Sequence, residues 1–313
     1  MDMAETERMS NPVLRGQLRA GELMRKHTSW RVGGPVDCCY TPADLEDLCV
    51  FLRSRAENEA LTFVGLGSNL LVRDGGIRGT VIFTHSALNR LQLDPIGDVT
   101  EVYAEAGVAT PKVARFAATH GFEGAEFLAG IPGTVGGSLA MNAGCYGTET
   151  WEITSRVLMV DRRGNRVKRD PAEFRITYRS VRSATPREEF FAAGWFRLTK
   201  GDGHRSRLRI KELLQRRIAS QPLEQSNAGS VFRNPPGDYA ARLIESCGMK
   251  GLRCGGAMVS PKHANFIINL GDASANDIET LIGWVQKKVK REFGVELERE
   301  VRILGDNVAG EGN

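Results

Sequence analysis

The 313-residue sequence lacks the segments that would direct it into or across a membrane. No apolar run approaches the roughly 20 residues that a transmembrane helix needs. The first residues, Met1 to Glu7, are acidic and polar, so they lack the basic start and the apolar run of a secretory signal peptide. We therefore expect a cytoplasmic protein with no membrane partner.

Cysteine and histidine are few, and neither is spaced for a metal site. No Cys-x-x-Cys pair occurs, and the adjacent Cys38 and Cys39 suit neither a zinc knuckle nor an easy disulfide. The histidines are scattered without ligand spacing, so we expect no metal and reduced, structural cysteines. The residues concerned are Cys38, Cys39, Cys49, Cys145, Cys247, Cys254, His27, His85, His120, His204 and His263.

A strong charge of one sign is also missing. The net charge is +4, from 42 basic and 38 acidic residues, which is a small excess for a protein that binds nucleic acid over a broad face. The basic run at 287–291 lies in an amphipathic helical pattern, so its charges are expected on the solvated side. We expect no nucleic-acid partner, whereas an anionic small molecule would use this modest positive bias equally well.

The pattern of the first two thirds of the chain predicts a mixed α+β region. With 41% hydrophobic residues the chain can bury a substantial core and should form about two domains. Helices are expected where a threonine and a proline precede an apolar stripe, with the threonine as cap: from Thr41 through Leu52, and from Thr110 to a stop at Gly121. Strands are expected at 61–64, 80–83, 157–160 and 190–198.

The remaining third is expected to form a second domain. We place its boundary near residue 204, because Gly201 to Gly203 is the most linker-like stretch. Helices are predicted at 207–218, 239–247 and 278–293, and strands at 265–269 and 295–304. In the last strand, alternation places four charged residues on one face: Glu296, Glu298, Glu300 and Arg302. Residues 1–24 are expected to be an N-terminal extension and 306–313 a tail, both at least partly flexible.

Two glycine-rich loops point to a phosphate-bearing ligand. Neither has the Gly-Lys-Ser/Thr of a Walker loop nor the Gly-x-Gly-x-x-Gly of a dinucleotide fold. Glycine lets backbone N–H groups approach an anion closely, so two such loops favour a diphosphate over mere tight turns. The expected contacts are Gly65, Gly67, Ser68 and Asn69 in the first loop, and Gly130, Ile131, Pro132, Gly133, Thr134, Gly136, Gly137, Asn142 and Gly144 in the second.

Five motifs in order give the sequence a specific resemblance. They are Gly65 to Val72, Gly130 to Gly137, Tyr178-Arg179, Gly229-Ser230-Val231-Phe232-Arg233-Asn234-Pro235 and Glu300-Val301-Arg302. Over about residues 25–305 the chain resembles the UDP-N-acetylenolpyruvoylglucosamine reductases, also called UDP-N-acetylmuramate dehydrogenases. This resemblance implies an FAD-binding fold of the vanillyl-alcohol-oxidase type at 25–204, with subdomains at about 25–85 and 86–204. It also implies a C-terminal α+β substrate-binding domain at 205–305.

The resemblance implies an NADPH-dependent flavoenzyme of peptidoglycan precursor synthesis. NADPH would reduce FAD and leave, and UDP-N-acetylglucosamine enolpyruvate would then take its place. The reaction puts a hydride on the methylene carbon and a proton on its neighbour, and it pushes negative charge onto the carboxylate. Two alternatives stay open at this point: another FAD oxidoreductase of the same fold, and a nucleotide-sugar binding protein without activity.

The resemblance also assigns roles to individual residues. Ser230 matches the proton donor, Arg179 the arginine that holds the substrate carboxylate, and Glu300 the glutamate that stabilises or protonates the enol-like intermediate. The period-two alternation of the predicted strand places Arg302 beside Glu300. Local sequence alone favours a turn serine for Ser230, and it leaves a surface arginine at a strand end as the alternative for Arg179. The substrate contacts implied are Tyr146, Tyr178, Asn234, Asn265 and Arg302.

Two further features place the chain within that family. Some members carry an extra loop with a tyrosine between the positions of Arg179 and Ser230, but here these residues are only 51 positions apart. The chain therefore resembles the shorter-loop type. No histidine or cysteine is clearly placed for covalent attachment, so we expect non-covalent FAD. No heptad pattern or large apolar stripe argues for a dimer, so we expect a monomer.

Overall fold

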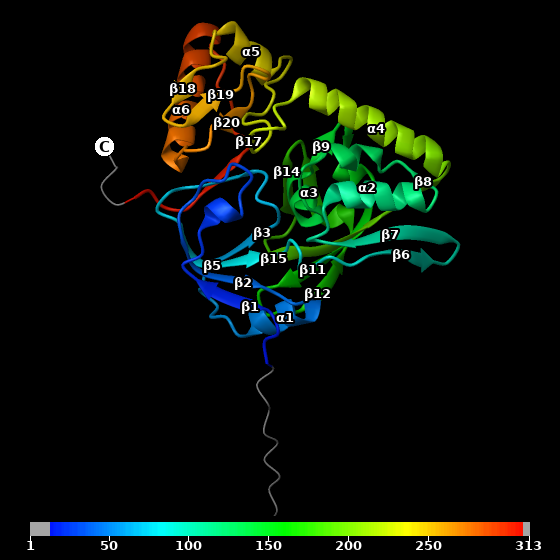
Figure 1. Ribbon diagram of the computed structural model, residues 1–313. Coiled ribbons are helices and arrows are strands. Elements are labelled where there is room, and N and C mark those ends of the chain that lie inside the picture. Colours follow the sequence, from blue (N-terminus) through cyan, green and yellow to red (C-terminus); the bar gives the residue numbers. More distant parts are fainter. Residues whose placement is uncertain (1–12, 309–313) are drawn as a thin grey trace, which may run out of the picture.

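In the computed structural model, which describes residues 13–308, the first glycine loop follows directly from a small parallel sheet (Figure 1). The sheet has the order β1 (Gln17–Ala20), β2 (Val36–Thr41), β5 (Ile77–Phe83) and β3 (Leu61–Val64), with only β1 antiparallel to its neighbour. The short helix η1 (Met24–Lys26) and the helix α1 (Leu45–Arg53) complete this first subdomain. The predicted strands at 61–64 and 80–83 are confirmed.

The expected cap of the first helix is wrong. Thr41 ends β2, where it pairs with Gln17, and the helix begins only at Leu45. Asp44 caps it instead, because its side chain accepts a hydrogen bond from the Asp47 N–H at 2.9 Å. The pairing of β2 with β1 therefore decides where the strand ends and the helix begins.

The second subdomain is built on an antiparallel sheet with helices on one face (Figure 1). Its order is β12 (Arg166–Arg169), β11 (Thr154–Asp161), β15 (Glu189–Phe196), β7 (Val99–Glu105) and β6 (Leu91–Ile96). The helices α2 (Thr110–Thr119) and α3 (Val135–Met141) pack on it, and the hairpin β13 (Phe174–Thr177) and β14 (Ser180–Ser183) lies against α3. Thr110 is the first residue of α2 and not its cap, since its hydroxyl donates to the Ile131 carbonyl at 2.6 Å.

The C-terminal region has its own sheet and core. The sheet order is β17 (Ser226–Asn227), β20 (Ile267–Asn269), β19 (Ala257–Val259) and β18 (Arg253–Cys254), covered by α5 (Ala240–Ser246) and α6 (Ala275–Phe293). The predicted helices at 239–247 and 278–293 are confirmed within a few residues. The short remaining elements of the described chain are η2 (Glu126–Gly130), η3 (Thr150–Glu152), η4 (Pro171–Glu173), β8 (Phe122–Glu123), β9 (Gly144–Cys145), β10 (Thr148–Glu149) and β16 (Thr199–Lys200).

The long final strand predicted at 295–304 is wrong. Only β21 (Arg302–Leu304) forms, and it pairs in parallel with β4 (Leu70–Val72) of the first subdomain. Between 295 and 301 the chain makes a single bridge, from Arg299 to Phe232. Alternation along this segment therefore does not govern which side chains face one another.

Helix α4 (Gly203–Ser220) packs on the second subdomain. Ser206 donates a 2.5 Å hydrogen bond to Glu126, and Ile210 is buried in the core formed by α2 and the antiparallel sheet. The predicted basic helix at 207–218 is confirmed and is longer than expected. The predicted domain boundary near residue 204 stays a prediction, and the packing of α4 favours a boundary after this helix.

Several long-range contacts fasten the C-terminal region to the first subdomain. The Trp30 indole N–H donates to the Ile267 carbonyl at 2.7 Å, and Arg73 holds Glu279 with two contacts of 2.8 Å. Asp74 accepts hydrogen bonds from the N–H groups of Ala275 and Asn276 at 3.0 Å each, at the start of α6. Together with the pairing of β4 and β21, these contacts fix the C-terminal region relative to the first glycine loop.

The expected flexible ends lie largely outside the described residues, since 1–12 and 309–313 are not described. Within 13–24, β1 pairs with β2 along its whole length. The described helices include none that combines the length and apolar character needed to cross a bilayer.

We predict that Asp74→Ala loosens the C-terminal region. Two N–H groups at the start of α6 lose their acceptor, and losing a cap costs about 1 kcal/mol. For a chain of this size the melting temperature should fall by about 2 °C, measured by circular dichroism. The matched control is Asp98→Ala, because Asp98 is exposed in the turn after β6. Equal melting temperatures for the two variants would contradict the prediction.

Candidate active site

The two predicted glycine loops lie against each other. A Cβ added to Gly65 would collide with the Thr134 hydroxyl, and one added to Gly133 would contact the Ser68 hydroxyl at 3.6 Å. Gly67 has a φ of +60°, and a Cβ there would collide with the His27 carbonyl. Glycine is thus required at Gly65 and Gly67 for the backbone to pass this closely. The two loops form one cradle, as a diphosphate ligand would need.

Two buried hydroxyls in this cradle have no partner. Thr134 and Ser138 are each only 2% exposed, and neither hydroxyl makes a hydrogen bond within the described residues. Leaving a buried hydroxyl unpaired costs about 1–3 kcal/mol, so such groups are rare unless a ligand pairs with them. Thr134 precedes α3 and Ser138 lies in its second turn, beside the glycines. The donors present therefore fit an anionic, oxygen-rich group such as the diphosphate of FAD.

Arg179 and Glu300 form an ion pair across the molecule. Arg179 lies at the turn between β13 and β14 with a φ of +55°, and its Nε is 2.9 Å from Glu300 Oε1. This contact is an ion pair and not an aligned hydrogen bond, since Nε has no hydrogen-bond partner. The two Nη atoms donate to the carbonyls of Asn142 at 3.3 Å and Gly144 at 3.0 Å. The guanidinium is held from three sides.

Glu300 is half-buried beside two cations. Burial raises the pKa of the Glu300 carboxyl, while Arg179 and then Arg233 act to lower it, and burial prevails. Arg233 donates to the Arg179 carbonyl at 3.1 Å, its Nη1 lies 3.7 Å from Glu298, and its Nε is buried without a partner. A half-buried carboxyl beside two guanidinium groups suits a proton donor that acts next to a developing negative charge.

The predicted pairing of Glu300 with Arg302 is wrong. Arg302 is exposed, and its Nε contacts the Met141 sulfur at 3.4 Å. The alternation argument fails because Glu300 precedes the short β21 and does not belong to a strand. The partner of Glu300 comes instead from a hairpin 121 positions earlier, which no local pattern indicates.

A backbone hydrogen bond links the segment that carries Ser230 to Glu300. The N–H of Glu300 donates to the carbonyl of Val231 at 2.8 Å, so the residue after Ser230 is fastened to Glu300. Ser230 is half-buried, and its hydroxyl makes no hydrogen bond within the described residues. It follows Gly229, whose φ of +76° forms the turn. The backbone at Ser230 is therefore held near Glu300, which pairs with Arg179.

The predicted substrate contacts divide into two groups. The side chains of Asn265 and Asn234 hold the local backbone: Asn265 bonds both the N–H and the carbonyl of Phe232, and Asn234 accepts from the Ala240 N–H. Tyr146 and Tyr178 are 40% and 46% exposed. Tyr146 has a φ of +57° and donates to the Leu213 carbonyl of α4 at 2.6 Å.

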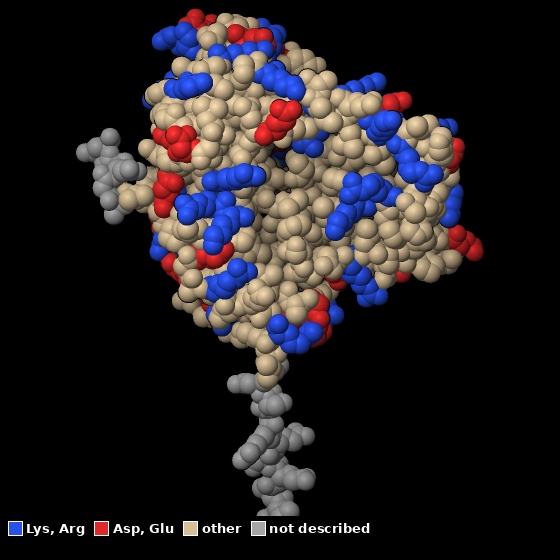
Figure 2. Space-filling view, viewed as in Figure 1, with Lys and Arg blue, Asp and Glu red and all other residues tan. Residues whose placement is uncertain are grey.

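Two cations near this site were not among the predicted site residues. Arg233 lies within the motif from Gly229 to Pro235, but no role was predicted for it. Arg217 of α4 has a lowered pKa because burial removes water from its charge, and Cys145 and Tyr146 partly offset this. Within residues 13–308 it forms no ion pair, although its Nε donates to Gln221. Figure 2 shows blue side chains gathered around the hollow on this face, where few red ones lie. The sequence shows the adjacent Arg216 and Arg217, but it does not indicate that Arg217 is partly buried.

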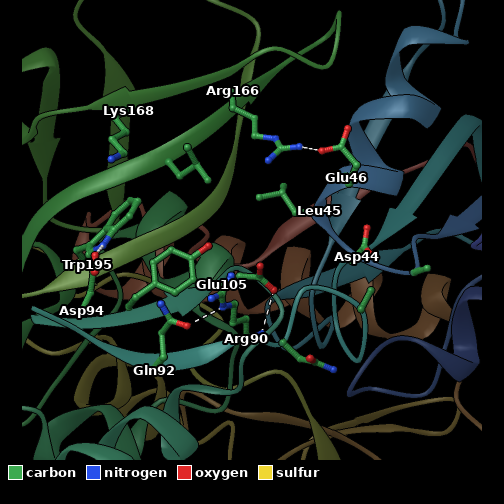
Figure 3. Close-up of a pocket in the computed structure, with 15 residues that line it drawn as sticks. Asp44, Leu45, Glu46, Arg90, Gln92, Asp94, Glu105, Arg166, Lys168 and Trp195 are labelled. Carbon is green, nitrogen blue, oxygen red and sulfur yellow. Dashed lines mark hydrogen bonds and ion pairs between the residues drawn. The ribbon is translucent and has the colours of Figure 1, made fainter.

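A separate cavity of about 760 Å³ lies on the other face of the antiparallel sheet (Figure 3). It contains none of the predicted site residues. Its polar groups largely satisfy one another, since Arg166 pairs with Glu46, the Trp195 N–H donates to Asp94, and Glu105 accepts from the Arg90 N–H at 2.9 Å. Burial raises the pKa of Glu105, but this charge balance indicates no ligand class.

No group of three or more potential metal-binding side chains lies together within residues 13–308. The candidate site therefore consists of the glycine cradle, the Arg179–Glu300 pair and Ser230.

Comparisons with known proteins agree with this geometry. A family model described as FAD binding domain matches residues 36–169, and one described as UDP-N-acetylenolpyruvoylglucosamine reductase, C-terminal domain, matches 221–304. Curated reductases of that name are similar along nearly the whole chain. The one from Thiobacillus denitrificans is 57% identical, covering 94% of this chain and 94% of its own, and that from Methylococcus capsulatus is 54% identical, covering 98% and 99%.

A solved structure extends the similarity to the fold. The crystal structure of UDP-N-acetylenolpyruvylglucosamine reductase from Thermus caldophilus is 32% identical in sequence, with a TM-score of 0.78. The alignment covers 93% of this chain and 100% of that one. These matches confirm the predicted α+β fold with an FAD-binding part and a C-terminal domain, and they favour the first of the three functions considered. The chain is an FAD-dependent oxidoreductase that belongs to the UDP-N-acetylenolpyruvoylglucosamine reductase family.

Proposed function

We propose that the protein reduces the enolpyruvyl ether of UDP-N-acetylglucosamine enolpyruvate to UDP-N-acetylmuramate, with NADPH as a transient reductant. The observation that carries this proposal is the half-buried Arg179–Glu300 pair near Ser230, at the junction of the glycine cradle and the C-terminal region. Bound non-covalently, FAD would supply the hydride. The residues of the chain then have to bind the cofactor, orient the substrate and deliver a proton.

The glycine cradle is the proposed FAD site. The backbone N–H groups of the two loops and the hydroxyls of Ser68, Thr134 and Ser138 would bind the diphosphate. Thr134 and Ser138 support this assignment most directly, because their buried hydroxyls lack partners. Asn69 and Asn142 contribute backbone shape to the cradle, since their side-chain amides donate to other parts of the chain.

We predict that Ser138→Ala weakens FAD binding about ten- to a hundredfold. The variant loses one hydrogen bond to a charged acceptor, which contributes about 1.5–3 kcal/mol. Titration of the apoprotein with FAD, followed by flavin fluorescence, measures the change. Ser220→Ala is the matched control, because Ser220 ends α4 and bonds only to the backbone of that helix. An unchanged affinity in Ser138→Ala would remove Ser138 from the cradle.

Arg179 and Glu300 are proposed to act on the enolpyruvyl group. The guanidinium of Arg179 would hold the substrate carboxylate and stabilise the charge that the hydride pushes onto it. Its two Nη atoms each retain a second hydrogen for this contact, since each donates only one bond in the structure. A second carboxylate near Arg179 disfavours ionisation of Glu300, so substrate binding would keep Glu300 protonated.

Ser230 is the proposed proton donor to carbon. A serine hydroxyl is a weak acid, so its charge must be stabilised by neighbours while the proton leaves. Arg179 and Arg233 lie at the adjacent Glu300 and provide positive charge, and Glu300 can return a proton. The unbonded hydroxyl of Ser230 is free to turn toward substrate.

We expect Ser230→Ala to separate the two half-reactions. Flavin reduction by NADPH should stay within about twofold, whereas oxidation of the reduced enzyme by the enolpyruvyl substrate should slow by about 10²–10⁴-fold, as for loss of a general acid. Stopped-flow absorbance of the flavin measures both. Ser226→Ala in β17 serves as the control. Equal slowing of both half-reactions would contradict the role of Ser230 in protonation.

The raised pKa of Glu300 predicts a pH dependence. The protonated carboxyl is the form that supports protonation, and burial keeps it protonated above its usual range. The rate of substrate reduction should therefore fall as pH rises through the raised pKa. In Glu300→Gln this fall should disappear, and the rate should be about a hundredfold lower throughout. Stopped-flow rates from about pH 5 to about pH 9 test this. A wild-type rate that rises with pH would contradict it.

The other expectations remain predictions. They are a monomeric, cytoplasmic protein without nucleic-acid or membrane partners, and substrate contacts at Tyr146, Tyr178, Asn234, Asn265 and Arg302. The exposed tyrosines are the members of this set whose side chains are most accessible to a ligand.

A further inference from the structure

Each glycine loop leads to an asparagine that contacts the catalytic pair. Asn69 ends the first loop, and its side-chain amide donates to the Glu300 carbonyl at 3.2 Å. The carbonyl of Asn69 accepts from the N–H of Arg302 at 3.0 Å. Asn69 therefore forms hydrogen bonds with the backbone on both sides of Val301. This contact joins positions 231 residues apart and lies directly before the pairing of β4 with β21.

Asn142 has the corresponding place after the second loop. It ends α3 with a φ of +42° and is 2% exposed. Its carbonyl accepts from Arg179 Nη1 at 3.3 Å, and its amide donates to Glu149 and, at 3.4 Å, to the Thr177 carbonyl. Thr177 ends β13, immediately before the turn that carries Arg179. Asn142 therefore holds both the guanidinium and the turn beneath it.

The Asn142 side chain is fully engaged, since its Nδ2 donates to Glu149 and Thr177 and its Oδ1 accepts from the Trp151 N–H. The Asn69 amide donates one hydrogen bond, to the Glu300 carbonyl. These bonds hold the backbone of Glu300 and the end of β13, directly before the turn that carries Arg179. We propose that Asn69 and Asn142 are positioning residues for the Glu300–Arg179 pair. Each lies at the end of an FAD-binding loop, so the position of that loop fixes the position of one member of the pair. This proposal rests on the function proposed above for Glu300 and Arg179.

The physical argument is clearest for Asn69. The N–H of Glu300 is bound to Val231 and its carbonyl to Asn69, so both backbone groups of Glu300 are fixed. Without the amide of Asn69, the carbonyl loses its donor, and the carboxyl can shift relative to Arg179 and Ser230. A displacement of about 1 Å at a reacting group costs up to about a hundredfold in rate. Aspartate cannot replace Asn69, because a carboxylate oxygen would face the carbonyl with no proton to donate.

Asn69→Ala tests the proposal in the complete, FAD-loaded enzyme. FAD affinity and flavin reduction by NADPH should stay within about twofold of wild type, while oxidation by the enolpyruvyl substrate should slow about 10- to 100-fold. The pH at which that rate falls should also shift, since the surroundings of Glu300 change. Asn89→Ala is the matched control, because Asn89 is an exposed asparagine whose amide bonds only to the Ser86 carbonyl. It should match wild type in every measurement.

A double variant shows whether Asn69 acts by positioning Glu300 or contributes to the substrate step independently of it. If Asn69 acts through Glu300, Asn69→Ala combined with Glu300→Gln should be no slower than Glu300→Gln alone. Additive losses would overturn the proposal. So would weaker FAD binding with a normal substrate step, because Asn69 would then be only a cofactor contact.

Asn142→Gly provides a second test should Asn69→Ala fold poorly. Glycine keeps the positive φ and the carbonyl that Arg179 uses, but it removes the amide that holds Thr177. The same selective slowing is expected, and wild-type rates in both half-reactions would overturn the role of this side chain. If wild type itself does not oxidise with the enolpyruvyl substrate, the proposed function fails. If wild type reacts and the asparagine variants match it, only the positioning role fails.

Discussion

The parallel pairing of β4 with β21 is the constraint on which the rest of the site depends. Strand β4 follows the first glycine loop without interruption, and β21 follows Glu300 at a distance of two residues. Joining these strands brings the end of the chain to the cofactor loop and sets Glu300 beside it. The fixed C-terminal region then carries Ser230 to the same place, through the bond between Val231 and Glu300.

Two parts of the molecule supply the three residues of the site, so Arg179 has to be held in place across the junction between them. Glu300 and Ser230 come from the C-terminal region, which is fastened to the first subdomain, whereas Arg179 comes from a hairpin of the second. A long arginine side chain reaching between parts loses much conformational freedom. Bonds to the carbonyls of Asn142 and Gly144 fix it before any ligand arrives, so its remaining donors are preorganised.

Local pattern predicts most helices and strands here because they bury an apolar stripe, as at 61–64 and 278–293. It fails where a long-range contact decides the outcome. Thr41 looks like a helix cap but is taken into β2 by its pairing with β1, and 295–301 alternates like a strand but finds no partner strand. The site residues were predicted from motifs in family order. The partner of Glu300 was not, because proximity of residues 121 positions apart is a property of the fold.

The electrostatics of the site depend on two half-buried arginines that share one half-buried carboxyl. Arg179 and Arg233 both act on the charge of Glu300, and the exposed Glu298 lies 3.7 Å from Arg233, so the cluster becomes positive when Glu300 is protonated. Two half-buried guanidinium groups near one carboxyl favour the binding of a further anion, and the buried Nε of Arg233 has no hydrogen-bond partner within the described residues. A substrate carboxylate would supply the missing charge. Binding it would in turn favour protonated Glu300, so that substrate arrival and the availability of a proton are linked by the same two arginines.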